Sequence, residues 1–272
     1  MTYRELVPLL RQELGDRENL DQEIRWMIEA FSGKDYPALD FDSNVTRLPF
    51  YKKAVERLKR HEPFQYVVGS QDFYGSIFIV NEQVLVPRPE TELLVDMAVK
   101  WGKGRELRAL DLCTGSGCIA ISLAKHLQGS FAGIDISEGA LAVARKNAQL
   151  HGVDVTMEYS DLFYHIPREL TFDLITANPP YLTQKEMQEI PLEVTHEPYI
   201  ALDGGPTGIY AIERIMKEVE ARLNPGGLFL MEIGEKQGPI CLELSEKYHL
   251  DGATIHRDYN EKDRILYWEK KS

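Results

Sequence analysis

The first 60 residues contain three short segments with apolar side chains at helical spacing. These side chains recur three or four positions apart in residues 3–14 and 21–31, and a third helix is expected from about Leu48 to Arg60. The apolar positions of the first two segments are Leu6, Leu9, Leu10 and Leu14, then Ile24, Met27, Ile28 and Phe31. Loops with Gly, Asp and Pro join the segments. We therefore predict a small helical domain over residues 1–70.

The pattern changes to short β-like runs after residue 63. Residues 72–75, 77–80 and 84–86 predict a β-hairpin that turns at Asn81-Glu82 and serves as a linker over residues 71–90. The run Val86-Pro87-Arg88-Pro89-Glu90-Thr91-Glu92 then starts a helix, with Pro89 or Thr91 near its N-terminus. Arg88 and Glu90 have two interpretations: they are part of the helix start, or they close over an active site.

Strand-like and helix-like patterns alternate from residue 108 onward. Strands are expected near residues 108–112, 131–136, 155–159, 172–177, 227–233, 253–257 and 264–269. Helices are expected near residues 118–127, 138–151, 208–223 and 236–248. Such alternation is typical of a parallel sheet covered by helices on both faces. The predicted fold class is therefore α/β, with residues 91–272 as the larger domain.

Charge is distributed unevenly along the 272 residues. The whole chain has a formal net charge of −12, and residues 1–70 carry 11 Lys and Arg against 12 Asp and Glu. The other −11 lies in residues 71–272, which argues against a long contact with nucleic acid because phosphate binding needs a basic surface. One basic cluster, at residues 52–61, is either a solvated helix face or a contact for an acidic or RNA-bound partner.

Cysteine usage and the absence of targeting signals indicate the compartment. Cys113, Cys118 and Cys241 have no disulfide or zinc spacing, which fits a reducing cytosol. The N-terminal residues do not resemble a signal peptide, and no apolar run approaches the roughly 18 residues that a membrane helix needs. We expect a cytoplasmic monomer without membrane contact.

A glycine-containing loop, Asp111-Leu112-Cys113-Thr114-Gly115-Ser116-Gly117-Cys118, joins the first strand of the sheet to its helix. Gly115 and Gly117 allow a tight turn and bring the N–H groups of the helix start close to a ligand. Asp135 ends the next strand, where a carboxylate can accept both hydroxyls of a ribose. The pair indicates an adenosine cofactor, but it does not distinguish a nicotinamide dinucleotide from S-adenosylmethionine.

The third strand of the sheet also ends at an acidic residue, Asp161. Its carboxylate could accept from the adenine amino group while Leu162 packs on the ring. The other interpretation of Asp161 is a helix or turn cap.

Asn178-Pro179-Pro180-Tyr181 follows an apolar run at residues 172–177, where a buried strand meets a loop. The prolines fix φ and lack N–H groups, so this segment offers carbonyl oxygens, to which Asn178 adds its side-chain oxygen. Tyr181 supplies a flat face for a planar amide or base. The segment is either a stiffened turn or a site for an NH2 group. Because it should lie beside the glycine loop, methyl transfer to an NH2 group suits it better than hydride transfer.

These motifs together resemble a known enzyme family. The glycine loop, Asp135 and Asn-Pro-Pro-Tyr are similar to class I S-adenosylmethionine-dependent methyltransferases that act on planar nitrogen. With residues 86–92 upstream and Ala201-Leu202-Asp203-Gly204-Gly205-Pro206-Thr207-Gly208 downstream, the chain resembles the HemK/PrmC-type release factor glutamine N5-methyltransferases over roughly residues 20–268. Cys113 departs from the Gly of many relatives, which is tolerable if its φ is not positive.

The resemblance implies a Rossmann-like fold with a mostly parallel seven-stranded sheet, an N-terminal helical domain for substrate docking and a connecting β-hairpin. It implies S-adenosyl-L-methionine as cofactor, S-adenosyl-L-homocysteine as product and no metal. The implied cofactor-binding residues are Cys113, Thr114, Gly115, Ser116, Gly117, Asp135, Asp161, Leu162 and Asn178. The residues implied to be catalytic are Asn178, Pro179, Pro180 and Tyr181. The same four residues, with Arg88 and Glu90, are expected to bind the substrate.

The resemblance also implies a substrate: the glutamine in the Gly-Gly-Gln motif of peptide chain release factors. In the implied mechanism, the Asn178 side-chain oxygen and the Pro179 carbonyl take the two amide hydrogens and orient the nitrogen for in-line attack. The alternatives are a glutamine of a ribosomal protein, an N6-adenine or N2-guanine of nucleic acid, and adenosine-ligand binding by an assembly factor without catalysis.

Overall fold

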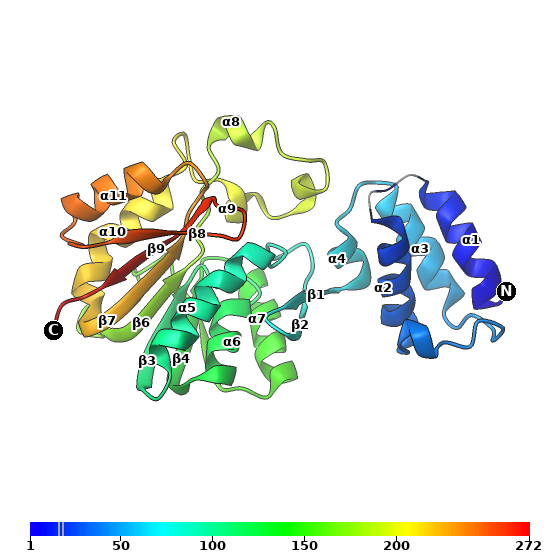
Figure 1. The fold of residues 1–272 in the computed structure, drawn as a ribbon, viewed down its shortest axis with the longest axis horizontal. Coiled ribbons are helices and arrows are strands. Elements are labelled where there is room, and N and C mark those ends of the chain that lie inside the picture. The colour runs from blue at the N-terminus through cyan, green and yellow to red at the C-terminus, as the bar shows by residue number, and fades with distance from the viewer. Residues whose placement is uncertain (16, 18) are drawn as a thin grey trace. The chain divides into compact units, whose positions relative to one another are not determined.

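The seven strands predicted from residue 108 onward form one sheet in the computed structural model, which describes residues 1–15, 17 and 19–272 (Figure 1). The chain divides into two compact units. The first contains Met1–Ser70 and the short segment Pro191–His196, and the second contains Gln71–Ile190 and Glu197–Ser272. Each unit has a hydrophobic core of its own.

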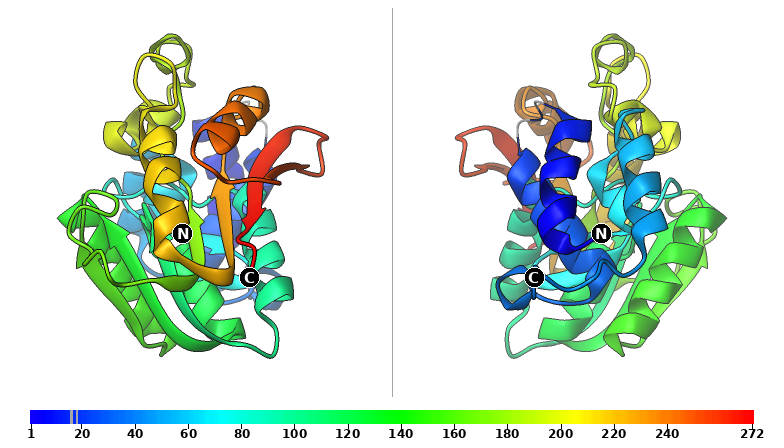
Figure 2. Two further views of the ribbon diagram at one scale, coloured as in Figure 1. Left: turned by 90° about the vertical axis from the view of Figure 1, so that its left-hand side faces the viewer. Right: turned by 90° about the vertical axis from the view of Figure 1, so that its right-hand side faces the viewer.

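The first unit is built from the three predicted helices and a short fourth one, coloured blue to cyan in Figure 2. They are α1 (Tyr3–Leu14), α2 (Leu20–Ser32), α3 (Leu48–Leu58) and α4 (Phe64–Val68). Their apolar faces meet in one core, in which Leu6, Met27 and Leu58 are almost fully buried. The three helices predicted from the spacing of apolar residues are therefore confirmed.

The predicted β-hairpin exists, but its predicted turn at Asn81-Glu82 is wrong. Strands β1 (Ser70–Phe73) and β2 (Ser76–Ile79) turn instead at Tyr74-Gly75, whose φ values are 48° and 69°. Positive φ at both central residues suits the right-handed twist of a two-residue hairpin, and Gly provides it readily. Residues 84–86 were also expected to be a strand but form none, and Val84 and Val86 are buried.

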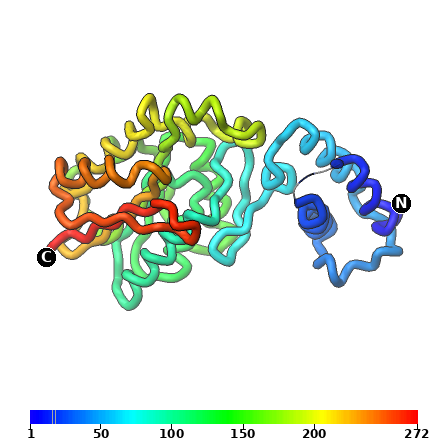
Figure 3. Tube along the Cα trace, turned by 45° about the horizontal axis from the view of Figure 1, so that its top comes forward, coloured from blue at the N-terminus to red at the C-terminus, as the bar shows by residue number. Residues whose placement is uncertain are grey.

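The main sheet has the strand order β5-β4-β3-β6-β7-β9-β8. Its strands are β3 (Glu106–Leu112), β4 (Gln128–Asp135), β5 (Val155–Tyr159), β6 (Phe172–Ala177), β7 (Leu223–Glu232), β8 (Thr254–Arg257) and β9 (Asp263–Glu269). The pairs from β5 to β7 are parallel, and β9 runs antiparallel to both β7 and β8. Figure 3 shows β8 and β9 as the red end of the trace.

Helices cover both faces of the sheet, as the alternating pattern predicted. The core on one face contains buried residues of α5 (Glu92–Gly102), α6 (Cys118–His126) and α7 (Glu138–His151). The core on the other face contains those of α10 (Tyr210–Arg222) and α11 (Gly238–Lys247). Between β6 and α10, the chain forms the short helices α8 (Gln184–Met187) and α9 (Tyr199–Leu202).

The strand order reverses beside β3, and this reversal positions the site. The chain moves outward from β3 to β4 and β5, then returns to place β6 on the other side of β3. Loops that follow neighbouring parallel strands on the two sides of such a switch point separate and leave a crevice at the carboxyl ends. The glycine loop follows β3, Asp135 ends β4 and Asn178 follows β6.

Candidate active site

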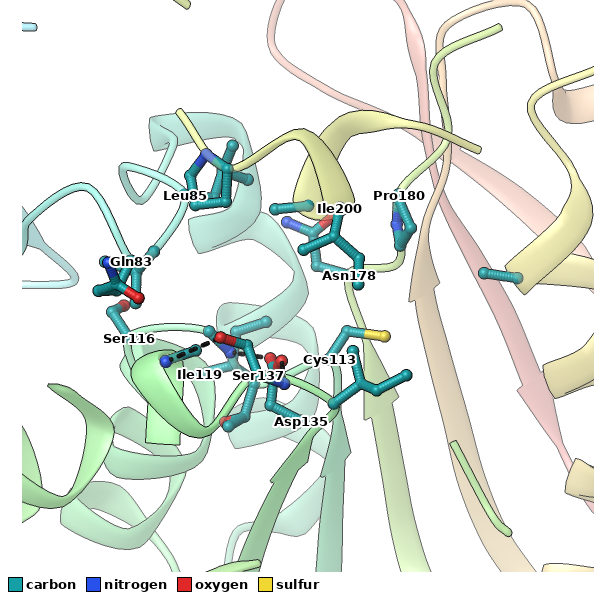
Figure 4. A pocket seen from close by; sticks show the side chains of 18 of the residues that line it. Gln83, Leu85, Cys113, Ser116, Ile119, Asp135, Ser137, Asn178, Pro180 and Ile200 are labelled. Carbon is teal, nitrogen blue, oxygen red and sulfur yellow. Dashed lines mark hydrogen bonds between the residues drawn. The ribbon is translucent and has the colours of Figure 1, made fainter. Parts of the chain in front are cut away.

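A cavity of about 420 Å³ lies at the carboxyl ends of β3, β4 and β6, within the second unit. Figure 4 shows Asp135 on one side of it, at the end of β4, and Asn178 on another, after β6. The sequence-predicted residues that line it are Arg88, Cys113, Thr114, Gly115, Ser116, Asp135, Asp161, Leu162, Asn178 and Pro180. Glu90, Gly117, Pro179 and Tyr181 are next to lining residues but do not line the cavity themselves.

The glycine loop turns tightly between β3 and α6. Gly117 has a φ of 80°, and a Cβ atom there would lie 2.9 Å from the Ile121 side chain and 3.1 Å from that of Ala144. A side chain at this position would therefore crowd Ile121 of α6 and Ala144 of α7. Cys113 also has a positive φ, 58°, so the condition under which its side chain was expected to be tolerable does not hold, and the residue carries the backbone strain of the left-handed region.

The Asp135 carboxylate connects two loops at the cavity. Its Oδ2 accepts the Gly115 N–H at 2.9 Å, and its Oδ1 accepts the Ser137 N–H at 2.9 Å. Burial raises the pKa of this carboxyl, while these N–H groups act in the opposite direction. Each carboxylate oxygen has two lone pairs, so both oxygens can still accept a hydroxyl of a ligand.

Asp161 has a partner that the sequence pattern did not indicate. Its Oδ2 lies 2.9 Å from Nη2 of Arg214, a cavity-lining residue of α10. No local signal marks Arg214, because it is one of several charged residues on a surface helix. Leu162 is buried and has a φ of 51°, in the left-handed region that non-glycine residues rarely adopt.

The Asn-Pro-Pro-Tyr segment is connected to two buried residues of other elements. The Asn178 Nδ2 donates to Thr91 Oγ1 at 3.3 Å, and the Thr91 hydroxyl donates to Glu232 Oε2 at 2.6 Å. The Tyr181 hydroxyl donates to Glu232 Oε1 at 3.3 Å, and burial raises the pKa of this phenol. Thr91 lines the cavity, whereas Glu232 lies behind it at the end of β7.

Arg88 contacts a buried carboxylate. Its Nη2 donates to Glu197 Oε1, while Glu197 Oε2 accepts the Val86 N–H at 2.9 Å. Glu197 is 6% exposed. Its two hydrogen bonds attach the segment before α5 to the segment before α9. The sequence pattern gave no indication of this role for Glu197.

The chain matches a family model described as a methyltransferase domain over residues 103–268. A release factor glutamine methyltransferase from Geobacter sulfurreducens is 34% identical over 97% of this chain and 95% of its own length. Another, from Flavobacterium psychrophilum, is 39% identical over 77% of this chain and 76% of its own length.

The fold is shared with solved methyltransferase structures. A methyltransferase from Pyrococcus furiosus superposes with a TM-score of 0.56 at 18% identity, covering 81% of this chain and 99% of that one. In the described part of the chain, no helix combines the length and apolar character needed to span a membrane.

Proposed function

The chain belongs to the release factor glutamine methyltransferase family, and we propose that the cavity at the carboxyl ends of β3, β4 and β6 is where it carries out this reaction. The enzyme transfers a methyl group from S-adenosylmethionine to the side-chain amide nitrogen of a release factor glutamine. The observation that carries the assignment of the site is that Asp135 and Asn178 line one and the same cavity.

The residues of the cavity fit S-adenosylmethionine. A volume of about 420 Å³ is in the range of small-molecule sites, and the glycine loop and the Asp135 carboxylate provide N–H donors and acceptors on one side. We assign the ribose hydroxyls to Asp135 and the adenine to the region of Asp161 and Leu162. When bound, the cofactor supplies the activated methyl group.

The Asn-Pro-Pro-Tyr segment is assigned to the target amide. An amide nitrogen is a weak nucleophile, because its lone pair is delocalised into the carbonyl. Asn178 Oδ1 and the Pro179 carbonyl oxygen would each accept one hydrogen of the NH2 group, which fixes the direction of the lone pair. Orientation of this kind supplies a large part of a rate enhancement.

We assign substrate docking to the first unit. The active site contacts one side chain, so selectivity for one glutamine requires a second surface. Residues 1–70 are nearly neutral, in contrast to the acidic remainder, and the large aromatic side chains of Trp26 and Phe50 are 45% and 55% exposed. Exposed aromatic side chains are frequent anchors in protein interfaces. We propose that the enzyme acts as a monomer in the cytoplasm.

The test uses purified enzyme, radiolabelled cofactor and two forms of a release factor, one with the Gly-Gly-Gln motif and one with Gly-Gly-Ala. We expect labelling of the first form alone, approaching one methyl group per factor. Equal labelling of both forms would refute the assigned acceptor. Labelling in a cell extract that nuclease abolishes, but protease does not, would indicate a nucleic-acid substrate.

A further inference from the structure

A chain of hydrogen bonds extends from the active site to a buried carboxylate. It runs from Asn178 Nδ2 to Thr91 Oγ1, 3.3 Å, and from the Thr91 hydroxyl to Glu232 Oε2, 2.6 Å. Thr91 is 2% exposed and Glu232 is 1% exposed. Because Ala177 pairs with Met231 across β6 and β7, Asn178 and Glu232 follow directly on neighbouring strands, and Thr91 lies between them.

The chain of bonds has one direction. The hydroxyls of Thr91 and Tyr181 both donate to Glu232, so each directs its single proton to this carboxyl group. Thr91 Oγ1 can then only accept a hydrogen bond from Asn178. The Asn178 amide must therefore turn its NH2 group toward Thr91 and its Oδ1 away from Thr91.

The alternative orientation would differ little in shape but greatly in chemistry. An Asn side chain rotated by 180° exchanges oxygen and NH2 at almost the same positions, so packing hardly distinguishes the two. In that orientation the Asn178 NH2 group would meet the NH2 group of the target glutamine, and two donors cannot form a hydrogen bond with each other. The amide orientation therefore decides whether Asn178 can accept from the substrate.

We propose that Thr91 and Glu232 are positioning residues that hold the Asn178 amide with Oδ1 available to the substrate. This inference rests on the proposed function of Asn178 and extends it to two residues that do not act on the substrate themselves. Thr91 acts directly on Asn178, and Glu232 fixes the proton of Thr91.

The cost of the buried carboxylate supports a role beyond packing. Burial raises the pKa of Glu232, and Glu90 acts in the same direction. Thr91, Arg264 and Tyr181 oppose this shift and favour the ionised form. A buried carboxyl group is costly compared with an apolar side chain of similar volume. Its presence directly after the apolar run at residues 228–231 is accounted for by the direction that it gives to its two hydroxyl donors.

The test compares Thr91→Val with Thr91→Ser in the full-length enzyme, with turnover of a release factor and calorimetric affinity for S-adenosylmethionine as readouts. Valine keeps the shape of threonine and removes the hydroxyl, whereas serine keeps the hydroxyl and loses a methyl group. If Thr91 only fills space, Thr91→Val should lower turnover less than Thr91→Ser does. If it positions Asn178, serine is the milder change, and Thr91→Val lowers kcat about tenfold or more, as loss of a buried hydrogen bond does, with little change in cofactor affinity.

A matched control is Ser122→Ala on α6, which removes a buried hydroxyl that has no hydrogen-bond partner among the described residues. This variant should keep the wild-type kcat. A Thr91→Val enzyme that turns over as fast as Thr91→Ser, or faster, would overturn the proposal.

A second readout does not depend on the substrate. The Asn178 side-chain NH2 group should exchange its protons slowly with solvent in the wild type and in Thr91→Ser, but quickly in Thr91→Val, as measured by nuclear magnetic resonance. Equal exchange in all three proteins would contradict the positioning role. If the wild type failed to label release factors while this exchange pattern held, the proposed function would fall and the orientation of Asn178 would stand.

Discussion

The Thr176 hydroxyl of β6 donates a hydrogen bond to Asp111 Oδ1 of β3 at 2.8 Å, across two neighbouring strands beneath the active site. Thr114 of the glycine loop donates to the other oxygen at 2.7 Å. Asp111 is 1% exposed, so this carboxyl connects the loop to the sheet from below. Both hydroxyls favour the ionised form, yet burial outweighs them and raises the pKa of Asp111 to about 7.

This pKa predicts how stability changes with pH. The ordinary pKa of this group is 3.8, so between about pH 4 and 7 the folded protein retains a proton that the unfolded chain has lost. The stabilisation is complete below pH 4 and is lost as pH rises to about 7. In Asp111→Asn this dependence is absent. Relative to wild type, the variant should gain stability between pH 4 and 7, by at most about 4 kcal/mol at 1.36 kcal/mol per pK unit.

Urea unfolding of both proteins at pH 4 and pH 8 measures this difference. Other titrating groups contribute almost equally to both proteins and cancel in the comparison. The same change in unfolding free energy for wild type and variant would show that Asp111 is ionised throughout this range.

Asp135→Ala should weaken the binding of S-adenosylmethionine and S-adenosylhomocysteine to the same extent. Both ligands carry the ribose assigned to this carboxylate, and a charge-assisted hydrogen bond is worth roughly 1.5 to 3 kcal/mol, or about one to two decades in affinity. Calorimetry with both ligands is the measurement. The variant also loses the Asp135 contacts to Gly115 and Ser137, so its melting temperature must be recorded alongside. Unchanged affinities would make Asp135 a purely structural residue.

Asn178→Ala should abolish most methyl transfer while leaving the cofactor bound. Its side chain is assigned to the target amide, whereas the glycine loop and Asp135 hold most of the cofactor. Removal of one positioned hydrogen-bonding group typically lowers kcat on the order of a hundredfold. Single-turnover kinetics together with cofactor calorimetry separate the two effects. Near-normal turnover would show that Asn178 has no role in methyl transfer. A large loss of cofactor affinity would show that Asn178 mainly binds the cofactor.

A shortened chain that starts at Gln71 should bind S-adenosylmethionine and fail to methylate an intact release factor. The cofactor residues and both cores of the second unit lie beyond residue 70, so this unit retains its own packing. Activity on a short Gly-Gly-Gln peptide should change much less, because a peptide does not need a docking surface.

Full-length Trp26→Ala provides the matched comparison for this shortened chain. It should lower transfer to the intact factor and leave transfer to the peptide unchanged. A soluble shortened enzyme with full activity on the intact factor would rule out docking by residues 1–70.

The pattern of the chain predicted the strands and helices of the second unit closely, since apolar runs separated by glycine and polar loops are local features. The pattern also predicted that the glycine loop, Asp135 and Asn178 lie at the same edge of the sheet, because each is at the carboxyl end of a parallel strand. The link between Thr91 and Glu232 was not predictable, because these residues are 141 positions apart and an acidic residue at a strand end has no local signature. The predicted hairpin turn was wrong because Tyr74-Gly75, which was assigned to the strand-like run at residues 72–75, is the turn itself.

The assignment of Pro191–His196 to the first unit was also beyond the sequence. This segment lies far along the chain, yet Glu193 pairs with Arg17 at 3.2 Å and the His196 ring contacts the Arg60 carbonyl oxygen at 3.0 Å. In the sequence, these side chains do not differ from other polar residues on the surface. The partners of each are therefore known only from the folded structure.

The position of β9 between β7 and β8 has a consequence for the nascent chain. Residues 263–269 are synthesised after both of their neighbours, so β7 presents an unpaired edge with Phe229 and Leu230 until β9 is available. During that interval β8 also lacks the strand that attaches it to the sheet. An open edge of an apolar strand is a template for wrong pairing between chains. Ribosome stalling or a premature stop in the 250s would thus leave a chain that has its cofactor loop and Asn178 but is prone to aggregate.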